Sequence, residues 1–263
     1  MARVLVASGG PTYAHDHGAT AVTITSLLTA AGYDVVTTTS HFRQLPDALR
    51  ADDPDVIVMH ALWWRMLADR YADIRDEWAY ESTPSVRKAL TEFVQNGGGL
   101  VALHTATICF DDWPGWGEIV GGQWNWDRSF HPLLGPVRVE VGGVEVGGVE
   151  VGGVEVGGVE VGGVVVGDGK TEHEITAGLR AYETVDEVYA HLDLQPGIVP
   201  LAYGVHPDGS QHPVLWARNF GSGRVAHFGL GHDSAALTNE TTAEILRRCV
   251  TWAVRSLEAS LPS

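Results

Sequence analysis

Cysteine is nearly absent from this sequence: Cys109 and Cys249 are the only two in 263 residues. They lie far apart and form no CxxC pair, so the sequence indicates neither a disulfide scaffold nor a cysteine-rich zinc site. Long hydrophobic runs are absent too. No stretch approaches the ~20 apolar residues of a membrane span, and the apolar run after Met1 is too short for a signal peptide. We therefore expect a cytoplasmic protein with no membrane partner.

Basic residues are scarce, with 17 lysines and arginines against 33 acidic residues and a formal net charge of -16 at pH 7. Such an excess repels nucleic acid unless the basic residues cluster, and no such cluster is present. The chain is 44% hydrophobic, so it can bury a full core over this length. We expect a single domain over residues 1–263 that has no nucleic-acid partner.

Strand-like and helix-like segments alternate in the first half of the chain. The predicted strands are apolar or β-branched runs at Arg3–Ser8, Tyr33–Thr39, Asp55–His60 and Gly99–His104. The predicted helices carry apolar residues at helical spacing and cover His17–Ala31, Pro84–Gln95 and Thr241–Leu257. Further strand-like runs follow at Glu187–Leu192, Ile198–Val205, Pro213–Ala217 and Arg224–Leu230. This order predicts an α/β fold, a parallel sheet flanked by helices.

A pentapeptide repeat interrupts the alternation. From Val139 the motif Val-Glu-Val-Gly-Gly occurs five times, ending at Gly163, and it decays before Asp168. Because five is odd and side chains alternate along a strand, one continuous strand would turn successive valine pairs to opposite faces. Gly-Gly pairs suit hairpin turns. We expect residues 139–168 to be an insertion, either a protruding β-ribbon or a partly disordered segment, that carries no chemistry.

Several ordered motifs resemble those of the ThuA-like (trehalose utilisation) family. They include Gly97-Gly-Gly-Leu-Val-Ala-Leu-His104, then Trp116-Gly-Glu-Ile-Val-Gly-Gly and Phe130-His-Pro. Asp186-Glu-Val-Tyr, His212-Pro-Val-Leu-Trp and Leu230-Gly-His-Asp follow in the same order as in that family. The resemblance covers nearly the whole chain apart from the repeats. It implies a flavodoxin-like sheet of the class I glutamine amidotransferase-like type and a role in carbohydrate metabolism, acting on keto-sugars or glycoside derivatives.

The strand-to-helix elbow of true amidotransferases holds a cysteine, where the helix N-terminus lowers the thiol pKa and backbone N–H groups stabilise an oxyanion. In this sequence His104 takes that place and Thr105 follows it. Cys109 lies five residues later. The sequence therefore disfavours amidotransferase chemistry, although an amidase-like hydrolase that uses Cys109 stays a third reading.

Three histidines are the candidate catalytic residues. His104 ends a predicted strand, where open parallel sheets bind ligands, and we expect it to act as a general base. His232 follows a later strand, and His131 lies in an aromatic segment on which a sugar ring can stack. Both would shape or polarise the pocket. Each of the three can equally be a packed structural histidine, and Asp233 after His232 is best explained as a helix N-cap.

Candidate substrate-binding residues are His60, Asp186, Glu187 and Trp116. His60 ends another predicted strand. Asp186 and Glu187 would point to opposite faces of a strand, so only one of them would face the pocket. His15 and His17, in the loop after the first strand, are candidate ligands for a divalent metal such as zinc, together with His60, His104 and His232. No HExxH motif supports a metal, and no cofactor is certain.

Two functions from different classes fit these residues. The first is a keto-sugar isomerase or lyase that removes the proton next to a carbonyl, with a small-molecule sugar as its partner. The second is a non-catalytic sugar-binding or assembly module, since one fold serves many functions. A homo-oligomer is compatible with either function.

Overall fold

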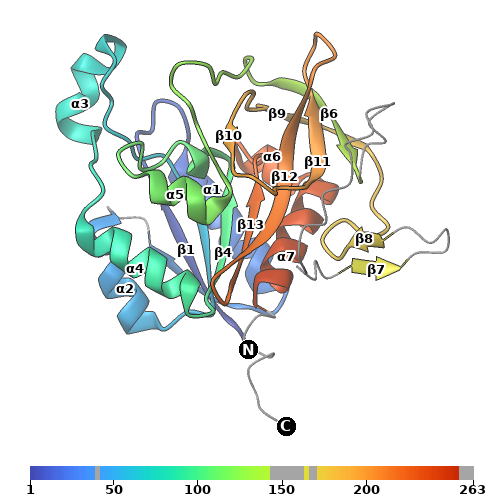
Figure 1. Cartoon of the computed structure of the whole chain (residues 1–263), viewed down its shortest axis with the longest axis horizontal. Coiled ribbons are helices and arrows are strands. Elements are labelled where there is room, and N and C mark those ends of the chain that lie inside the picture. The colour runs from blue at the N-terminus through green and yellow to red at the C-terminus, as the bar shows by residue number, and fades with distance from the viewer. Residues whose placement is uncertain (39–41, 143–162, 166–170, 255–263) are drawn as a thin grey trace.

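A nine-stranded sheet forms the centre of the computed structural model, which describes residues 1–38, 42–142, 163–165 and 171–254 (Figure 1). In spatial order its strands are β2 (Asp34–Thr38), β1 (Arg3–Gly9), β3 (Val56–Ala61), β4 (Gly99–Leu103), β13 (Gly223–Phe228), β12 (Gln211–Phe220), β11 (Pro200–Val205), β6 (Gly135–Val141) and β9 (Tyr182–Asp186). Two small sheets accompany it, β5 (Gly122–Gln123) with β10 (Asp193–Leu194) and β7 (Gly163–Val165) with β8 (Thr171–His173).

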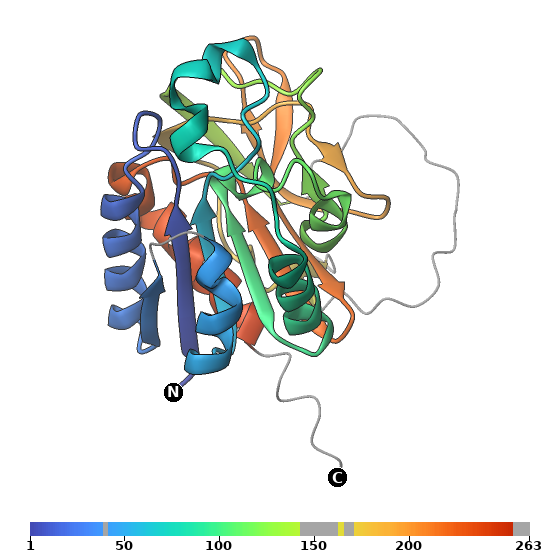
Figure 2. The ribbon, with the colours of Figure 1, turned by 90° about the vertical axis from the view of Figure 1, so that its left-hand side faces the viewer.

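The first five strands of the large sheet, from β2 to β13, are parallel, as predicted. Their arrows point away from the chain's N-terminus, so the carboxyl ends of these strands lie together at the opposite end of the molecule (Figure 2). The strands β3 and β4 are buried along their whole length, which explains their uninterrupted apolar sequences. This half of the sheet matches the mixed α/β architecture expected from the sequence.

The remaining pairs, from β13 through β12, β11 and β6 to β9, are antiparallel, which the sequence analysis did not predict. For two of these pairs, β11 with β12 and β12 with β13, the physical reason is a short connection. Only Gly221 and Ser222 separate β12 from β13, and residues 206–210 separate β11 from β12. Connections this short join antiparallel neighbours, whereas a parallel crossover needs a dozen or more residues.

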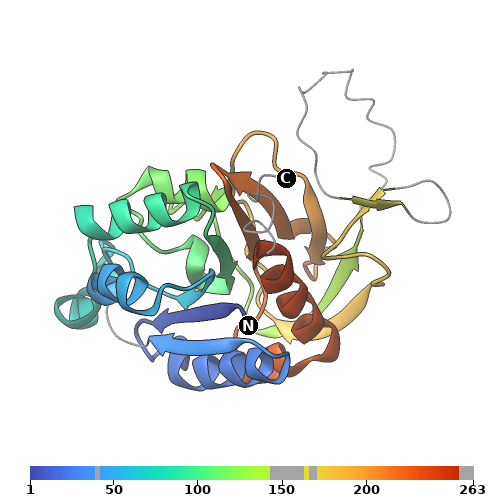
Figure 3. The same cartoon turned by 90° about the horizontal axis from the view of Figure 1, so that it is seen from below.

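Helices cover both faces of the sheet. In chain order they are α1 (His17–Ala30), α2 (Leu45–Asp52), α3 (Ala72–Trp78), α4 (Pro84–Gln95), α5 (Pro114–Val120), α6 (Ser234–Thr238) and α7 (Glu240–Val254). One core cluster joins α1, α6 and α7 to alternate residues of the strands, and a second joins α2, α4 and α5 to the intervening residues. Figure 3 shows α1 and α7 on one side of the sheet and α2 and α4 on the other. In the part of the chain with assigned structure, no helix has the length and apolar character to cross a bilayer.

Element boundaries agree closely with the sequence for α4, which covers Pro84–Gln95 as predicted. The predicted strand Glu187–Leu192 is wrong, because β9 occupies Tyr182–Asp186 and ends just before Glu187. At this end of the strand the Asp186 carboxylate accepts a hydrogen bond from the Glu187 backbone N–H at 2.9 Å. Of the predicted repeat ribbon, residues 143–162 and 166–170 lie outside the described residues.

Asp186 links β9, at the far edge of the sheet, to the loop that follows β13 at the centre of the sheet. Although β9 lies four strands beyond β13 in the sheet order, Asp186 Oδ2 accepts a hydrogen bond from Gly231 N at 2.7 Å. Gly231 follows β13, so the antiparallel half must curl over the core to make this contact. The core cluster beneath it includes Val188, Val214 and Leu237. This curl brings the end of β9 to the carboxyl ends of the parallel strands.

Gly223, the first residue of β13, offers a test of how closely β13 and α4 pack. A Cβ at this position would overlap the carbonyl oxygens of Val94 and Gly98, which are backbone atoms that cannot move aside easily. We expect Gly223→Ala to lower the free energy of unfolding by about 1–3 kcal/mol, as overpacking does. Urea denaturation measures the change. As a control, Gly18→Ala in α1 meets only Asp16 Oδ1 at 3.4 Å and is expected to stabilise the helix by ~0.5–1 kcal/mol. An unchanged stability in Gly223→Ala would contradict the packing.

His227 on β13 predicts how stability depends on pH. Its ring is buried 3.9 Å from the Trp216 ring, centroid to centroid, and burial lowers its pKa to about 3 from 6.5. The unfolded chain therefore takes up the proton first, so this contribution to stability is lost as the pH falls from about 6.5 toward 3, by up to ~1.4 kcal/mol per pH unit. We expect His227→Gln to show a smaller loss than wild type in urea titrations over this range. Equal slopes for both proteins would contradict the assignment.

Candidate functional site

The candidate site lies where loops from four strands meet. His15 lies in the loop after β1, His104 directly follows β4, His232 follows β13, and Glu187 follows β9. One ring nitrogen or carboxylate oxygen from each of these residues lies within 4.8 Å of those from the other three. We call these four residues the histidine–glutamate cluster. Its position at the carboxyl ends of parallel strands is where α/β sheets bind ligands.

His104 forms the elbow that the sequence predicted. Its φ of 43° places it in the left-handed region, which is uncommon for a residue other than glycine, and it begins a 3-10 helix over His104–Thr107. Its side chain is fully buried. Its Nδ1 lies 3.0 Å from the carbonyl oxygen of Gly229, so we assign the ring proton to Nδ1. The lone pair is then on Nε2, where the hydroxyl of Tyr189 donates a hydrogen bond at 3.2 Å.

Glu187 is the centre of charge in the cluster. Its Oε2 lies 3.4 Å from His232 Nδ1, 3.5 Å from His131 Nδ1 and 3.7 Å from His104 Nε2. Burial acts to raise the pKa of the Glu187 carboxyl, but the contacts with His232 and His131 lower it more, so its net shift is downward. Glu187 is therefore an ionised carboxylate that is almost enclosed by imidazole rings.

The histidines differ in their preference for a proton. Burial lowers the pKa of His15 to about 4 and that of His104 well below 6.5. Burial lowers the pKa of His232 as well, but the Glu187 carboxylate and nearby acids more than offset this, so its pKa is raised. At neutral pH the cluster thus offers lone pairs on His15 and His104, and His232 is the ring most ready to carry a proton.

Asp186 holds the loop that carries His232. Its carboxylate accepts hydrogen bonds from three backbone N–H groups, those of Glu187, Gly231 and His232. Burial raises its pKa to about 6, and these three hydrogen bonds partly offset the rise. Asp233 caps α6 by accepting from Ala236 N at 2.8 Å, as expected from the sequence. Asp186 and Glu187 therefore have different tasks, since the first supports the backbone and the second meets the imidazoles.

His131 and two tryptophans form the exposed rim of the cluster. The His131 side chain is 36% exposed, and its Nδ1 also lies 2.9 Å from the carbonyl oxygen of Pro132. The Trp124 ring lies 6.1 Å from the His131 ring and 6.1 Å from that of Trp126, centroid to centroid. Trp126 in turn stacks on Trp64 at 6.0 Å. Across the described ranges, the buried indole N–H groups of Trp64 and Trp124 have no acceptor.

Three other residues named from the sequence lie outside the cluster. His60 is fully buried, and its two ring nitrogens lie 3.1 Å from the carbonyl oxygen of Gly231 and 3.2 Å from the Thr20 hydroxyl. His17 is buried at the start of α1, with its ring 5.4 Å from that of His60. Trp116 is fully buried in the core cluster of α2, α4 and α5, where its indole donates to Ala106 O at 2.8 Å.

Cys109 is unsuited to act as the nucleophile of an amidase-like hydrolase, the third hypothesis from the sequence. Its thiol is fully buried and donates to the carbonyl oxygen of Ala61 at 3.1 Å. Burial raises its pKa to about 12. A nucleophilic cysteine needs a thiolate that substrate can reach. Cys109 meets neither requirement.

Sequence reasoning missed Tyr189 and Gly229. Tyr189 belongs to the Asp186-Glu-Val-Tyr motif, so its proximity to Glu187 in the chain was the available signal. Its ring packs at 4.8 Å from that of His104, where its hydroxyl meets Nε2. Gly229 accepts the His104 hydrogen bond through its backbone carbonyl, and a backbone acceptor cannot be predicted from a pattern of side chains.

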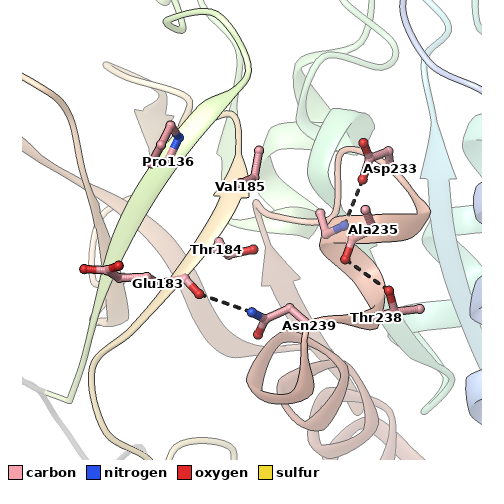
Figure 4. A pocket seen from close by; sticks show the side chains of 9 residues that line it. Pro136, Glu183, Thr184, Val185, Asp233, Ala235, Thr238 and Asn239 are labelled. Atoms are coloured by element: carbon pink, nitrogen blue, oxygen red, sulfur yellow. Dashed lines mark hydrogen bonds between the residues drawn. The ribbon is translucent and has the colours of Figure 1, made fainter.

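A cavity of about 530 Å³ adjoins the same corner of the fold, between β9 and α6 (Figure 4). Its lining includes Glu183, Val185, Asp233 and Asn239, and Asn239 donates a hydrogen bond to the carbonyl oxygen of Glu183 across it. None of the four cluster residues lines this cavity. The chemistry-bearing side chains therefore gather at the histidine–glutamate cluster and not in this cavity.

Comparisons with known proteins give the family and the fold. The family model described as "Trehalose utilisation" (ThuA) matches residues 3–253. A ThuA-like protein from Parabacteroides merdae is similar in structure, with a TM-score of 0.68, 17% identity, and coverage of 96% of this chain and 90% of that chain. A cytoplasmic protein from Salmonella typhimurium gives a TM-score of 0.54 at 15% identity, with 97% and 98% covered.

A further similar structure is a β-galactosidase from Bacillus circulans, with a TM-score of 0.51 at 13% identity. The match covers 98% of this chain but 31% of the enzyme, so the likeness concerns the fold of one part of it. No curated protein sequence matches the chain. Since the family model spans nearly the whole sequence and a ThuA-like protein shares its architecture, the chain belongs to the trehalose utilisation (ThuA) family.

Proposed function

We propose that this chain is a cytoplasmic enzyme of carbohydrate metabolism that acts on a keto-sugar or a related glycoside derivative. Family membership supports the carbohydrate-related role, because the family is described by trehalose utilisation. The similar protein from Salmonella typhimurium is described as cytoplasmic, which supports the location. The observation that carries the enzymatic proposal is the pairing of an exposed imidazole, His131, with the buried carboxylate of Glu187 at 3.5 Å.

The proposed reaction begins by removing the proton from the carbon next to the sugar carbonyl. His131 directs Nδ1 toward Pro132 O and Glu187, so Nε2 of this partly exposed ring has the lone pair that accepts the proton. The electron pair of the broken C–H bond moves into an enediolate, whose oxygen is stabilised by the proton on His232. Return of the proton to the former carbonyl carbon, with transfer of the hydroxyl proton between the two enediol oxygens, gives an isomer. Cleavage instead expels the oxygen substituent on the carbon β to the carbonyl, on the other side of the deprotonated carbon, and the leaving oxygen takes up a proton.

His104 has a positioning role in this proposal, in contrast to the general-base role expected from the sequence. A side chain that is fully buried behind Glu187 and Tyr189 does not touch a sugar. Its Nε2 fixes the Tyr189 hydroxyl and faces the Glu187 carboxylate. His104 thereby sets the position of the carboxylate that His131 and His232 share.

The aromatic rim supports a sugar as the ligand. Trp126 is 39% exposed and stacks on the buried Trp64, which gives a flat apolar surface beside His131. Sugar rings present C–H faces that pack on such surfaces, and their hydroxyls take hydrogen bonds from ring donors.

Deuterium exchange tests the proposed reaction. With a 3-keto glycoside in D₂O, NMR is expected to show deuterium entering the carbon next to the carbonyl and the isomer or cleavage product appearing. We expect His131→Asn and Glu187→Gln each to reduce the exchange rate at least ~100-fold, the usual scale for losing an acid–base group. His191→Asn, at an exposed histidine of the same region, serves as the matched control with an unchanged rate.

Two outcomes would overturn this proposal. Full exchange in His131→Asn would remove the base assignment. Saturable sugar binding by wild type without exchange on any keto-sugar would identify the non-catalytic sugar-binding alternative instead.

A further inference from the structure

We infer that the histidine–glutamate cluster, His15, His104, His232 and Glu187, binds a divalent transition-metal ion. One ligand atom from each residue lies within 4.8 Å of the others, and the four residues come from four different loops. The sequence suggested His15 and His17 as metal ligands. In the structure His15 joins the cluster, whereas His17 packs against His60 beside it.

The spacing of the cluster is close to that of a tetrahedral site. Metal bonds of about 2.0–2.2 Å put neighbouring tetrahedral ligands about 3.4 Å apart. Glu187 Oε2 already lies 3.4 Å from His232 Nδ1 and 3.7 Å from His104 Nε2. The ligand atoms lie within 4.8 Å of one another, so the longest separation would need to shorten by up to about 1.4 Å when an ion binds, through small rotations of these side chains, of which His232 is the least buried.

Two of the rings are held in the way that metal-binding histidines usually are. His104 Nδ1 lies 3.0 Å from the carbonyl oxygen of Gly229, and His15 Nδ1 lies 3.4 Å from that of His232. A histidine ligand normally donates its other ring N–H to a carbonyl or carboxylate, which fixes the ring and its tautomer. The backbone thus leaves the lone pair of both rings on Nε2. At His104 an ion would take the place of the Tyr189 hydroxyl, which donates to Nε2 at 3.2 Å.

His232 supplies an independent observation. Its Nδ1 is buried and, over the residues with assigned structure, makes no hydrogen bond of acceptable geometry, although Glu187 Oε2 lies only 3.4 Å away. A buried nitrogen without a partner is rare in folded proteins. An ion between this nitrogen and the carboxylate satisfies both groups at once.

The donor set indicates the class of metal. Three imidazoles and one carboxylate suit zinc, manganese, iron, cobalt or nickel, whereas calcium and magnesium prefer oxygen ligands. A divalent ion also balances the buried Glu187 charge, leaving one net positive charge next to the exposed rim at His131. The binding site does not depend on the proposed reaction. Where that reaction holds, an ion held by these residues would replace the His232 proton and would supply the positive charge that stabilises the enediolate oxygen.

Cobalt titration of the full chain tests the site. Protein stripped with a chelator is expected to bind one Co²⁺ per chain, with the visible absorption bands of a low-symmetry site, and Zn²⁺ is expected to displace it. We expect His15→Gln and Glu187→Gln to weaken Co²⁺ binding at least about 100-fold, exceeding the loss caused by changing a residue behind a ligand. His212→Gln is the matched control, because His212 is equally buried but lies outside the cluster, and its affinity should equal that of wild type.

Absence of a stoichiometric cobalt complex in wild type would overturn the inference without reference to any variant. Wild-type affinity in both ligand variants, with folding verified by circular dichroism, would overturn the location. The metal site and the proposed reaction fail separately. Ion binding without deuterium exchange would leave the site standing and overturn the reaction, whereas exchange in protein that binds no ion would do the reverse.

Discussion

The hydrogen bond between His104 Nδ1 and the carbonyl oxygen of Gly229 is the interaction on which the rest of the site depends. It joins the ends of the adjacent parallel strands β4 and β13 at 3.0 Å. It also holds His104 in a backbone conformation with a φ of 43°, which costs about 1–3 kcal/mol and persists where the surroundings enforce it. Because the Gly229 carbonyl accepts a hydrogen bond from Nδ1–H, the lone pair of the ring lies on Nε2, which faces Tyr189 and Glu187.

A second constraint brings the acidic residues to these histidines. The antiparallel half of the sheet curls until Asp186 at the end of β9 accepts the backbone N–H groups of Gly231 and His232. The next residue, Glu187, then lies among the imidazoles of His104, His131 and His232. The hydrogen bonds that Asp186 accepts from the backbone therefore also fix the position of Glu187 beside the exposed His131.

Much of this could be predicted from the sequence, for physical reasons that differ between elements. The parallel strands and the α4 helix can be predicted because their apolar patterns follow directly from burial on one or both faces. The positions of His104 and His232 at strand ends followed from the same patterns. His60 was harder, because β3 extends to Ala61 and the His60 ring turns to the Gly231 carbonyl and Thr20. Nothing in the local sequence distinguishes this orientation from one that faces a ligand.

The contribution of β9 could not be derived from local patterns. Pairing of β9 with β6 at the far edge depends on contacts between segments distant in the chain, and the predicted strand over Glu187–Leu192 displaced it by several residues. The Asp186-Glu-Val-Tyr motif was noticed through the family resemblance, yet its geometry was not. Only the curled sheet shows that Asp186 supports the backbone while Glu187 and Tyr189 meet His104.

The tautomer of His104 tests the central claim most directly. Nitrogen-15 NMR of histidine-labelled protein near neutral pH, with His104 assigned by comparison with His104→Asn, distinguishes a protonated ring nitrogen from one with a lone pair. The account predicts a neutral His104 ring that is protonated on Nδ1 and carries its lone pair on Nε2. A neutral ring protonated on Nε2, or a doubly protonated ring, would contradict it.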